Sequence, residues 1–180
     1  MTLPEENRII ELAKTDPKDF EPLYNYYFKK IFVFVLSRVG DQEVASDLTS
    51  QVFLKAIVNL KRYKYLGFRM SAWLMKIADN EVKHFFRKSN KVRNVLITDM
   101  VIANLSQTVE NNNKETLLDA LMKLLHTLEE EALQLIEMRF FEEMSFKEIG
   151  YILEITENNA KVRTYRLLDK LRNAMSHEEI

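Results

Sequence analysis

The sequence contains no cysteine and only three glycines among its 180 residues. The lack of cysteine excludes disulfide bonds, thiol nucleophiles and thiolate metal sites, and it fits a reducing compartment. The glycines stand apart at Gly40, Gly67 and Gly150, so neither a phosphate-binding glycine loop nor a dinucleotide fingerprint can be assembled. Nucleotide-dependent enzymes of those two kinds are therefore excluded.

Long apolar runs are also absent. The longest, IFVFVL at residues 31–36, is far shorter than the ~20 residues with which a helix crosses a bilayer. The opening MTLPEENRII is acidic and has no basic segment ahead of an apolar stretch, so no signal peptide is predicted. We expect a chain that does not enter the membrane and, by default, a cytoplasmic location.

The formal net charge is only −1, but the charge is distributed unevenly. Between Lys61 and Arg93, ten basic residues oppose two acidic ones, a local charge of +8. Between Lys161 and Arg172, five basic residues oppose Asp169 alone, a local charge of +4. Two basic surfaces on an otherwise acidic chain are compatible with nucleic-acid binding at two places.

Apolar residues recur at helical spacing along nearly the whole chain, and no alternating strand of useful length is found. The fold class is therefore all-α, with enough apolar residues for one modest core or two small ones. Residues 94–113 lose the helical period and end in a run of asparagine, which predicts a flexible linker with a short helix within 95–105. We expect two small helical domains, at residues 1–93 and 114–180.

Three helices are predicted in the first domain. Asp16 and Pro17 begin the first, Gly40 ends it, Asp41 begins the second, and the third runs from about Phe68 to Arg87. The side chains expected to face the core are Phe20, Leu23, Tyr24, Tyr27, Ile31 and Val35 in the first helix, Val44, Ala45, Leu48, Val52 and Ala56 in the second, and Trp73, Leu74, Ile77, Ala78 and Phe85 in the third.

The second domain starts with a leucine-rich stretch from Leu117 to Leu128, followed by a helix whose Leu133, Ile136 and Phe140 face inward. Ser145 and Glu148 have the spacing of a capping box, and a last helix begins at Thr156. The short helix, tight turn and second helix form a helix-turn-helix pattern.

Within this pattern, Gly150 is the small residue where two helices cross closely. The inward positions are Ile149, Leu153, Ile155 and Ala160. Glu154 occupies the turn, which must accept a positive φ at a residue other than glycine or adopt another shape.

The exposed face of the last helix carries amides and arginines, which can read base edges or hold phosphate. From spacing alone, an ordinary helical hairpin with a solvated basic face explains this segment equally well.

The segment SFKEIGYILEITENNAKVRTYRLLDKLR resembles the promoter-reading helix-turn-helix of sigma factors of the extracytoplasmic-function group. FEPLYNYYFKKIFVFVLSRVGDQEVASDLTSQVFLKAI and FRMSAWLMKIADNEVKHFFRK resemble the other sigma domain, which binds RNA polymerase and melts the promoter. The two matches cover about four-fifths of the chain in the family's order.

The resemblance implies core RNA polymerase as a partner, bound through the clamp helices of its largest subunit and through its flap. In the family the segment that matches DLTSQVF contacts the clamp helices, which implicates Asp47, Gln51 and Phe53. A place in the hydrophobic core explains Phe53 equally well.

The resemblance also implies two contacts with promoter DNA. Cations neutralise the phosphates of an opened strand, and an aromatic face or a pocket replaces the stacking of an extruded base. For the minus-ten element, Tyr65, Phe68 and Arg69 are candidates for a pocket, with Lys76, Asn80, Lys83, His84, Arg87 and Lys88 along the helix. For the minus-thirty-five element the candidates are Asn158, Asn159, Lys161, Val162, Arg163, Tyr165 and Arg166.

No catalytic residue, metal site or cofactor is predicted, because the only histidines, His84, His126 and His177, are dispersed along the chain. Two other interpretations remain open. The chain could be a free-standing helix-turn-helix regulator, or a sigma factor that a partner protein delivers to DNA. An anti-sigma factor is a further partner that the resemblance implies.

Overall fold

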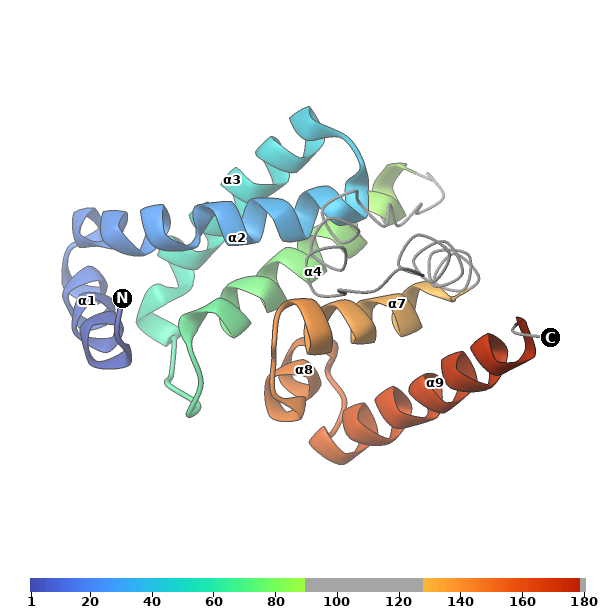
Figure 1. The fold of residues 1–180 in the computed structure, drawn as a ribbon. Helices are drawn as coiled ribbons and strands as arrows, with labels where there is room; N and C mark the ends of the chain where they lie inside the picture. Colours follow the sequence, from blue (N-terminus) through green and yellow to red (C-terminus); the bar gives the residue numbers. More distant parts are fainter. Residues whose placement is uncertain (90–127, 179–180) are drawn as a thin grey trace, which may run out of the picture. The chain divides into compact units, whose positions relative to one another are not determined.

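A computed structural model describes residues 1–89 and 128–178 of the chain (Figure 1). These residues are mainly helical, and no strand occurs within the two ranges, in agreement with the predicted all-α class. Contacts divide the chain into two units, Met1–Leu96 and Ile97–Ile180, which are described separately below. The predicted linker at 94–113, its short helix and the leucine-rich stretch up to residue 127 lie outside the described residues.

The first helix, α1 (Leu3–Thr15), is one that the sequence analysis did not predict. Thr2 accepts a hydrogen bond from the backbone N–H of Glu5, whose carboxylate in turn accepts one from the N–H of Thr2, forming a capping box. The helix packs against α2 and against the two 3-10 turns of the first unit. Besides Ile10 and Ala13, its buried side includes Glu6, a charged residue.

The second helix, α2 (Glu21–Val39), follows a 3-10 turn, η1 (Pro17–Phe20), which Asp16 caps in place of the predicted longer helix. The left-handed backbone at Gly40, with φ of 68°, ends α2 as predicted. Five of the predicted side chains of this segment are buried, namely Phe20, Leu23, Tyr27, Ile31 and Val35, and Phe34, Ser37 and Arg38 are buried as well. Tyr24 was predicted to face inward but is exposed, because it lies at the rim of the core with its ring against Phe53.

The helices α3 (Gln42–Asn59) and α4 (Met70–Ser89) complete the first unit, with the 3-10 turn η2 (Leu60–Arg62) after α3. Asp41 caps α3 as predicted, because its carboxylate accepts a hydrogen bond from the N–H of Val44 at 3.0 Å. Helices α2, α3 and α4 pack against one another and enclose one hydrophobic core (Figure 1).

Most of the inward positions predicted for α3 and α4 are buried. These positions are Ala45, Leu48, Val52, Ala56, Leu74 and Ala78. Val44, Trp73, Ile77 and Phe85 were expected in the core but are only partly buried, because they lie at the edges of their helices' buried faces. The helix α4 starts two residues later than predicted.

In the second unit, α7 (Glu130–Ile136) continues into a π-helical turn, η3 (Glu137–Phe141). Leu133 and Ile136 are buried as predicted, but Phe140 is 49% exposed and its predicted place in the core is wrong. A π turn is wider than an α turn and rotates the residues that follow it. Met138 and Met144 fill the core there instead.

The predicted helix-turn-helix is formed by α8 (Phe146–Leu153) and α9 (Glu157–Glu178). Both groups of the Ser145–Glu148 capping box form their hydrogen bonds. The turn takes the first of the two predicted solutions, because Glu154 adopts the left-handed conformation with φ of 59°. The backbone of the turn approaches α8 closely at Gly150, since a Cβ atom there would lie 2.8 Å from the carbonyl oxygen of Ile155.

None of the helices in the described ranges is long and apolar enough to cross a membrane.

Because the neighbour at Gly150 is backbone, we expect Gly150→Ala to lower the free energy of unfolding by about 1–3 kcal/mol. Glu154→Gly is the control in the same turn, and it should not destabilise because glycine adopts a positive φ freely. Thermal unfolding followed by circular dichroism measures both variants. If Gly150→Ala had the same melting temperature as the parent, the two helices would not need this close approach.

Candidate nucleic-acid interface

The outward face of α4 carries most of the residues predicted to contact the minus-ten element. Lys76, Asn80, Lys83 and Arg87 follow one another at helical spacing along this face, and Trp73 precedes them. Lys76 is partly buried, whereas Asn80, Lys83, His84, Arg87 and Lys88 are exposed. The helix therefore presents one strip in which cations alternate with an aromatic and an amide side chain.

One of these cations, Lys83, also has a structural role. Its ammonium lies 2.7 Å from the carboxylate of Asp79, one turn earlier, and Asp79 is only 1% exposed. Removing a charged carboxylate from water is costly unless a cation compensates it. The positive charge of Lys83 therefore compensates in part the buried charge of Asp79.

Beside this strip is an open pocket of about 350 Å³ between the end of α3, η2 and α4. Its lining combines the ring of Trp73 with polar and charged groups. The lining residues are Lys55, Asn59, Arg62, Trp73, Ile77, Asn80 and Glu81. Lys55 donates a hydrogen bond to Glu81 at 2.6 Å within this lining. The pocket offers an aromatic wall, hydrogen-bonding groups and a guanidinium in one place.

The predicted pocket residues Tyr65, Phe68 and Arg69 do not line this pocket. Tyr65 is exposed on the loop before α4, and Phe68 is partly buried. Of the nine predicted minus-ten residues, only Asn80 belongs to the pocket lining. Trp73 was assigned to the core but is partly buried, packing on Tyr63 with ring centroids 5.0 Å apart while it lines the pocket.

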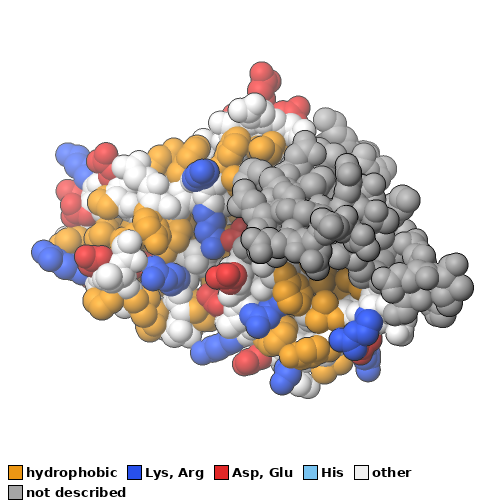
Figure 2. Space-filling view, in the orientation of Figure 1, with side chains coloured by type: hydrophobic (Ala, Val, Ile, Leu, Met, Phe, Trp, Pro, Cys, Tyr) orange, Lys and Arg blue, Asp and Glu red, His pale blue; other side chains and the backbone are white. Residues whose placement is uncertain are grey.

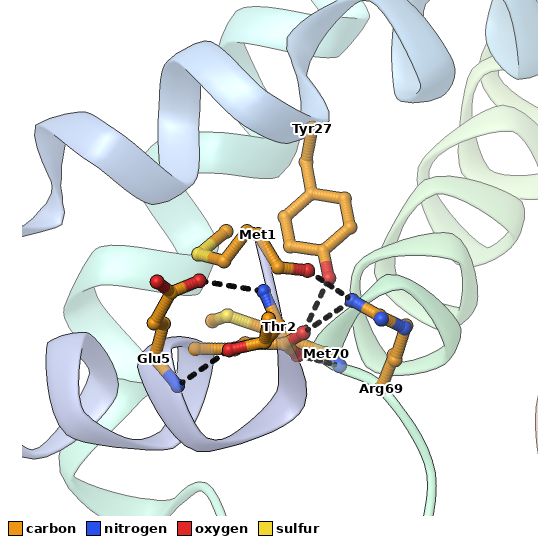
Figure 3. Close-up of polar contacts among 7 residues, drawn as sticks. Met1, Thr2, Glu5, Tyr27, Arg69 and Met70 are labelled. Carbon is orange, nitrogen blue, oxygen red and sulfur yellow. Dashed lines mark hydrogen bonds and ion pairs between the residues drawn. The ribbon is translucent and has the colours of Figure 1, made fainter.

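The guanidinium of Arg69 lies beside the buried carboxylate of Glu6, on α1. The Glu6 carboxylate accepts hydrogen bonds from the Tyr27 hydroxyl at 2.8 Å, from Arg69 Nη1 at 3.3 Å and from the backbone N–H of Met70 at 2.5 Å. Figure 3 shows Tyr27 and Arg69 converging from two elements beside the start of α1. Burial, together with the hydrogen bond to Glu6, raises the pKa of Tyr27 above its ordinary value.

The outward face of α3 is a separate surface. Asp47 and Gln51, predicted to bind polymerase, are exposed, and Leu54 and Val58 continue the same face at helical spacing, with 63% and 72% of their surface exposed. Phe53, the third predicted residue, is only 2% exposed and packs against the rings of Phe20, Tyr24 and Phe28. This burial corrects the prediction of a direct polymerase contact at Phe53, because the inward side of α3 must fill the core.

All seven residues predicted to contact the minus-thirty-five element are exposed on α9. They are Asn158, Asn159, Lys161, Val162, Arg163, Tyr165 and Arg166. The buried stripe of α9 is narrow, at Ala160, Thr164, Leu167 and Leu171.

Two of the seven also contact other parts of the second unit. The Tyr165 ring lies 6.1 Å from that of Phe146, and Arg163 is paired with the exposed Glu131 at 3.3 Å. Figure 2 shows lysine and arginine side chains spread between apolar ones over the visible face of the described residues.

Sequence reasoning missed the α3 side of the pocket and the apolar half of the α3 face. Spacing could have found both. Lys55 and Asn59 lie one turn apart, as do Trp73 and Ile77, and Leu54 and Val58 extend the spacing of Asp47 and Gln51. Glu6 had no comparable signal, because its partners lie at least 21 residues away. Among the described residues, no group of three or more histidine, aspartate or glutamate side chains could hold a metal ion.

Two family models match the chain. Sigma-70 region 2 matches residues 23–92, and Sigma-70 region 4 matches residues 118–171. The sigma factor BldN of Streptomyces coelicolor is 29% identical over 166 residues, which cover 91% of this chain and 63% of BldN. The sigma factor SigM of Bacillus subtilis is 24% identical over 154 residues, which cover 84% of this chain and 92% of SigM.

Solved structures of sigma factors have the same fold. CnrH, in complex with the cytosolic domain of CnrY, aligns with a TM-score of 0.64 at 15% identity, covering 96% of this chain and 97% of CnrH. RpoE from Bartonella quintana, in complex with the anti-sigma factor NepR, aligns with a TM-score of 0.62 at 19% identity, covering 88% of this chain and 98% of RpoE.

The chain belongs to the sigma-70 family of RNA polymerase sigma factors, in the extracytoplasmic-function group. It carries region 2 of that family followed by region 4. Its function is that of a sigma factor, which binds RNA polymerase and recognises promoters.

The raised pKa of Tyr27 predicts a pH dependence of stability. As pH rises past 10, the ordinary value for tyrosine, the unfolded chain loses this proton before the folded chain does, so the stability that neutral Tyr27 contributes falls. The difference in unfolding free energy between the parent and Tyr27→Phe should therefore shrink above pH 10, by at most about 1.4 kcal/mol per pH unit. Urea unfolding from pH 8 to pH 11 measures it, with Tyr65→Phe as the exposed control. A difference that stays constant over this range would contradict the buried hydrogen bond.

Proposed function

We propose that this sigma factor divides its work among three surfaces: the outward face of α3 for polymerase, the α4 strip with its pocket for the opened minus-ten strand, and α9 for the minus-thirty-five element. The observation that carries the proposal is the pocket at Trp73, since it combines stacking and hydrogen-bonding groups beside a strip of cations. An extruded base needs this combination, because it loses both its stacking and its pairing.

The polymerase surface is supported by the composition of the α3 face. Asp47 and Gln51 offer polar contacts, and Leu54 and Val58 add large apolar side chains that stay exposed among residues 1–89. An exposed apolar group next to polar ones is typical of a protein-binding surface. Phe53 supports this face from within the core rather than by contact.

The minus-ten surface is supported by the orientation of α4 side chains. Trp73 and Asn80 reach the pocket from the same face that carries Lys76 and Arg87, so a strand following the cations passes the pocket entrance. Arg62 adds a cation at the pocket itself. Phosphates along the strand and one base in the pocket can therefore be bound together.

The minus-thirty-five surface is supported by the formed helix-turn-helix and by the exposure of its second helix. In this fold the second helix enters the major groove. Asn158 and Asn159 lie at the start of α9, where side chains of such a helix reach base edges, and Arg163 and Arg166 lie one and two turns further along.

We also infer that the chain has no active site of its own and acts in the cytoplasm, where core polymerase is found. The aligned structures of CnrH and RpoE are complexes with partner proteins, and the partner of RpoE is an anti-sigma factor. An anti-sigma factor is thus a candidate partner here, and a partner that delivers the chain to DNA remains the alternative to direct reading by α9.

A charge reversal on the α3 face tests the polymerase surface. Asp47→Lys with Gln51→Lys should weaken binding to core polymerase by about tenfold or more, because it removes contacts and adds repulsion while the core is untouched. The matched control is Asp19→Lys with Asn25→Lys, two exposed residues of the same unit that add the same positive charge elsewhere. Equal polymerase affinity of the two double variants would remove α3 as the docking face.

The two DNA surfaces should fail in different ways. Arg163→Ala with Arg166→Ala should lower promoter occupancy by about tenfold through lost groove and phosphate contacts, and should spare opening once the complex has formed. Arg62→Ala with Asn80→Ala should leave occupancy nearly intact and lower the open fraction by about tenfold, because the extruded base loses its partners.

Footprinting of the holoenzyme reports occupancy, and permanganate reactivity of unpaired thymines reports opening. Lys170→Ala on α9 and Lys61→Ala beside the pocket are the controls. Both are exposed basic residues that are not among those proposed to contact DNA. Unchanged occupancy in the α9 variant would favour delivery by a partner. Tight, specific binding by the isolated chain would favour the free-standing regulator.

A further inference from the structure

The buried carboxylate of Glu6 connects α1 to the segment that enters α4. Residue 6 precedes the region that the family model matches, which starts at residue 23. Its carboxylate is 1% exposed and accepts its hydrogen bonds from three separate places in the first unit: Tyr27 on α2, Arg69 at the end of the loop, and the N–H of Met70 at the start of α4. Two of these three donors, Arg69 and Met70, lie where the chain enters α4.

The contact with Met70 acts as a helix cap supplied from a distance. The first N–H groups of a helix have no partner within the helix, and an anionic acceptor near them is favourable because of the helix dipole. Glu6 Oε1 accepts the Met70 N–H at 2.5 Å, so a side chain of α1 fixes where α4 begins. The strip and the pocket wall that α4 carries follow from that starting point.

The contact with Arg69 fixes the preceding loop. Arg69 Nη1 donates to Glu6 Oε2 at 3.3 Å and to the backbone carbonyl of Met1 at 3.1 Å, so both α1 and the residue before its cap hold the guanidinium (Figure 3). Tyr65 and Leu66, four and three residues earlier, are exposed on this loop. The position of these two residues therefore depends on Arg69, which anchors the C-terminal end of the loop.

We propose that Glu6 is a positioning residue for promoter opening: it holds the 64–69 loop and the first turn of α4 in the arrangement that receives the opened strand. The proposal rests on the proposed role of α4 in binding that strand. It also assigns Arg69 a different part from the one its sequence position suggests. The guanidinium acts chiefly through Glu6, as the anchor of the loop, rather than as a phosphate contact.

A double-mutant cycle tests this assignment. Glu6→Gln keeps the shape of the side chain but directs an N–H₂ group at donors, and Arg69→Gln breaks the same pair from the exposed side. In holoenzyme, each should lower the permanganate-reactive fraction by about fivefold to tenfold with footprinted occupancy retained. The open fraction of the double variant should be no lower than that of the more impaired single variant, because both substitutions remove the same interaction between Glu6 and Arg69. Multiplied effects in the double variant would mean that Arg69 contacts DNA directly, and would overturn the proposal.

Two controls separate positioning from a general loss of stability. Tyr27→Phe removes one hydrogen bond from the same carboxylate and leaves its bonds from Arg69 and Met70 in place, and Glu5→Ala removes the acceptor of the Thr2 N–H in the capping box of α1. Both should lower the melting temperature and leave opening unchanged at a temperature where the chain is folded. If Tyr27→Phe impairs opening as much as Glu6→Gln does, the role of Glu6 is only structural and the proposal fails.

Hydrogen exchange of the full chain, without polymerase or DNA, gives a readout that does not depend on the proposed function. In Glu6→Gln, the amides of residues 64–70 should exchange about tenfold faster than in Tyr27→Phe. If Glu6→Gln does not fold, the same increase is expected in Arg69→Gln. Unchanged exchange there would overturn the positioning role. If the parent holoenzyme opened no promoter, the proposed function would be refuted. The exchange result would still show whether Glu6 holds the loop in place.

Discussion

The position of one buried charge fixes how the first unit presents the surface that we propose to bind DNA. The carboxylate of Glu6 is removed from water, so it has to be matched by donors, and its donors come from α2, from the loop before α4 and from α4 itself. Apolar packing alone tolerates small shifts between helices, whereas hydrogen bonds to one carboxylate do so much less. The relation of α4 to α2 is therefore fixed at one point, and the rest of α4 follows as a rigid helix.

From that point the outward faces of the helices become available for function. Each helix of a small core buries one face, and in α3 and α4 the remaining face is the one with unusual composition. On α3 it is polar at one end and apolar at the other, as a protein-binding face requires. On α4 it combines cations with Trp73 and Asn80, as a single-stranded nucleic acid requires. One core thus supports two surfaces of different chemistry.

Local patterns in the sequence were sufficient for the helices that form this core. Asp41, Gly40 and the Ser145–Glu148 pair marked helix ends correctly, because a cap is a short-range interaction between residues a few positions apart. The turn of the helix-turn-helix was anticipated for the same reason, since the only question at Glu154 was the sign of φ.

The failures have a common cause in contacts between distant residues. Phe140 was misplaced because a π turn changed the helical register. Phe53 was assigned from the resemblance, and its burial favours the place in the core that the sequence left open. The pocket at Trp73 was not predicted, because its lining comes from three elements. Glu6 was missed altogether, since a glutamate in an acidic first segment gives no sign of the tyrosine and arginine that meet it in the fold.

The central claim is that this chain directs core RNA polymerase to promoters and opens them with its first unit. Transcription reconstituted from core polymerase, the purified chain and a genomic promoter library, with transcript starts read at single-base resolution, tests it most directly. The account predicts starts that depend on the chain and that cluster downstream of one shared pair of minus-thirty-five and minus-ten sequences, with unpaired thymines at the latter. Starts that are the same with and without the chain would contradict it.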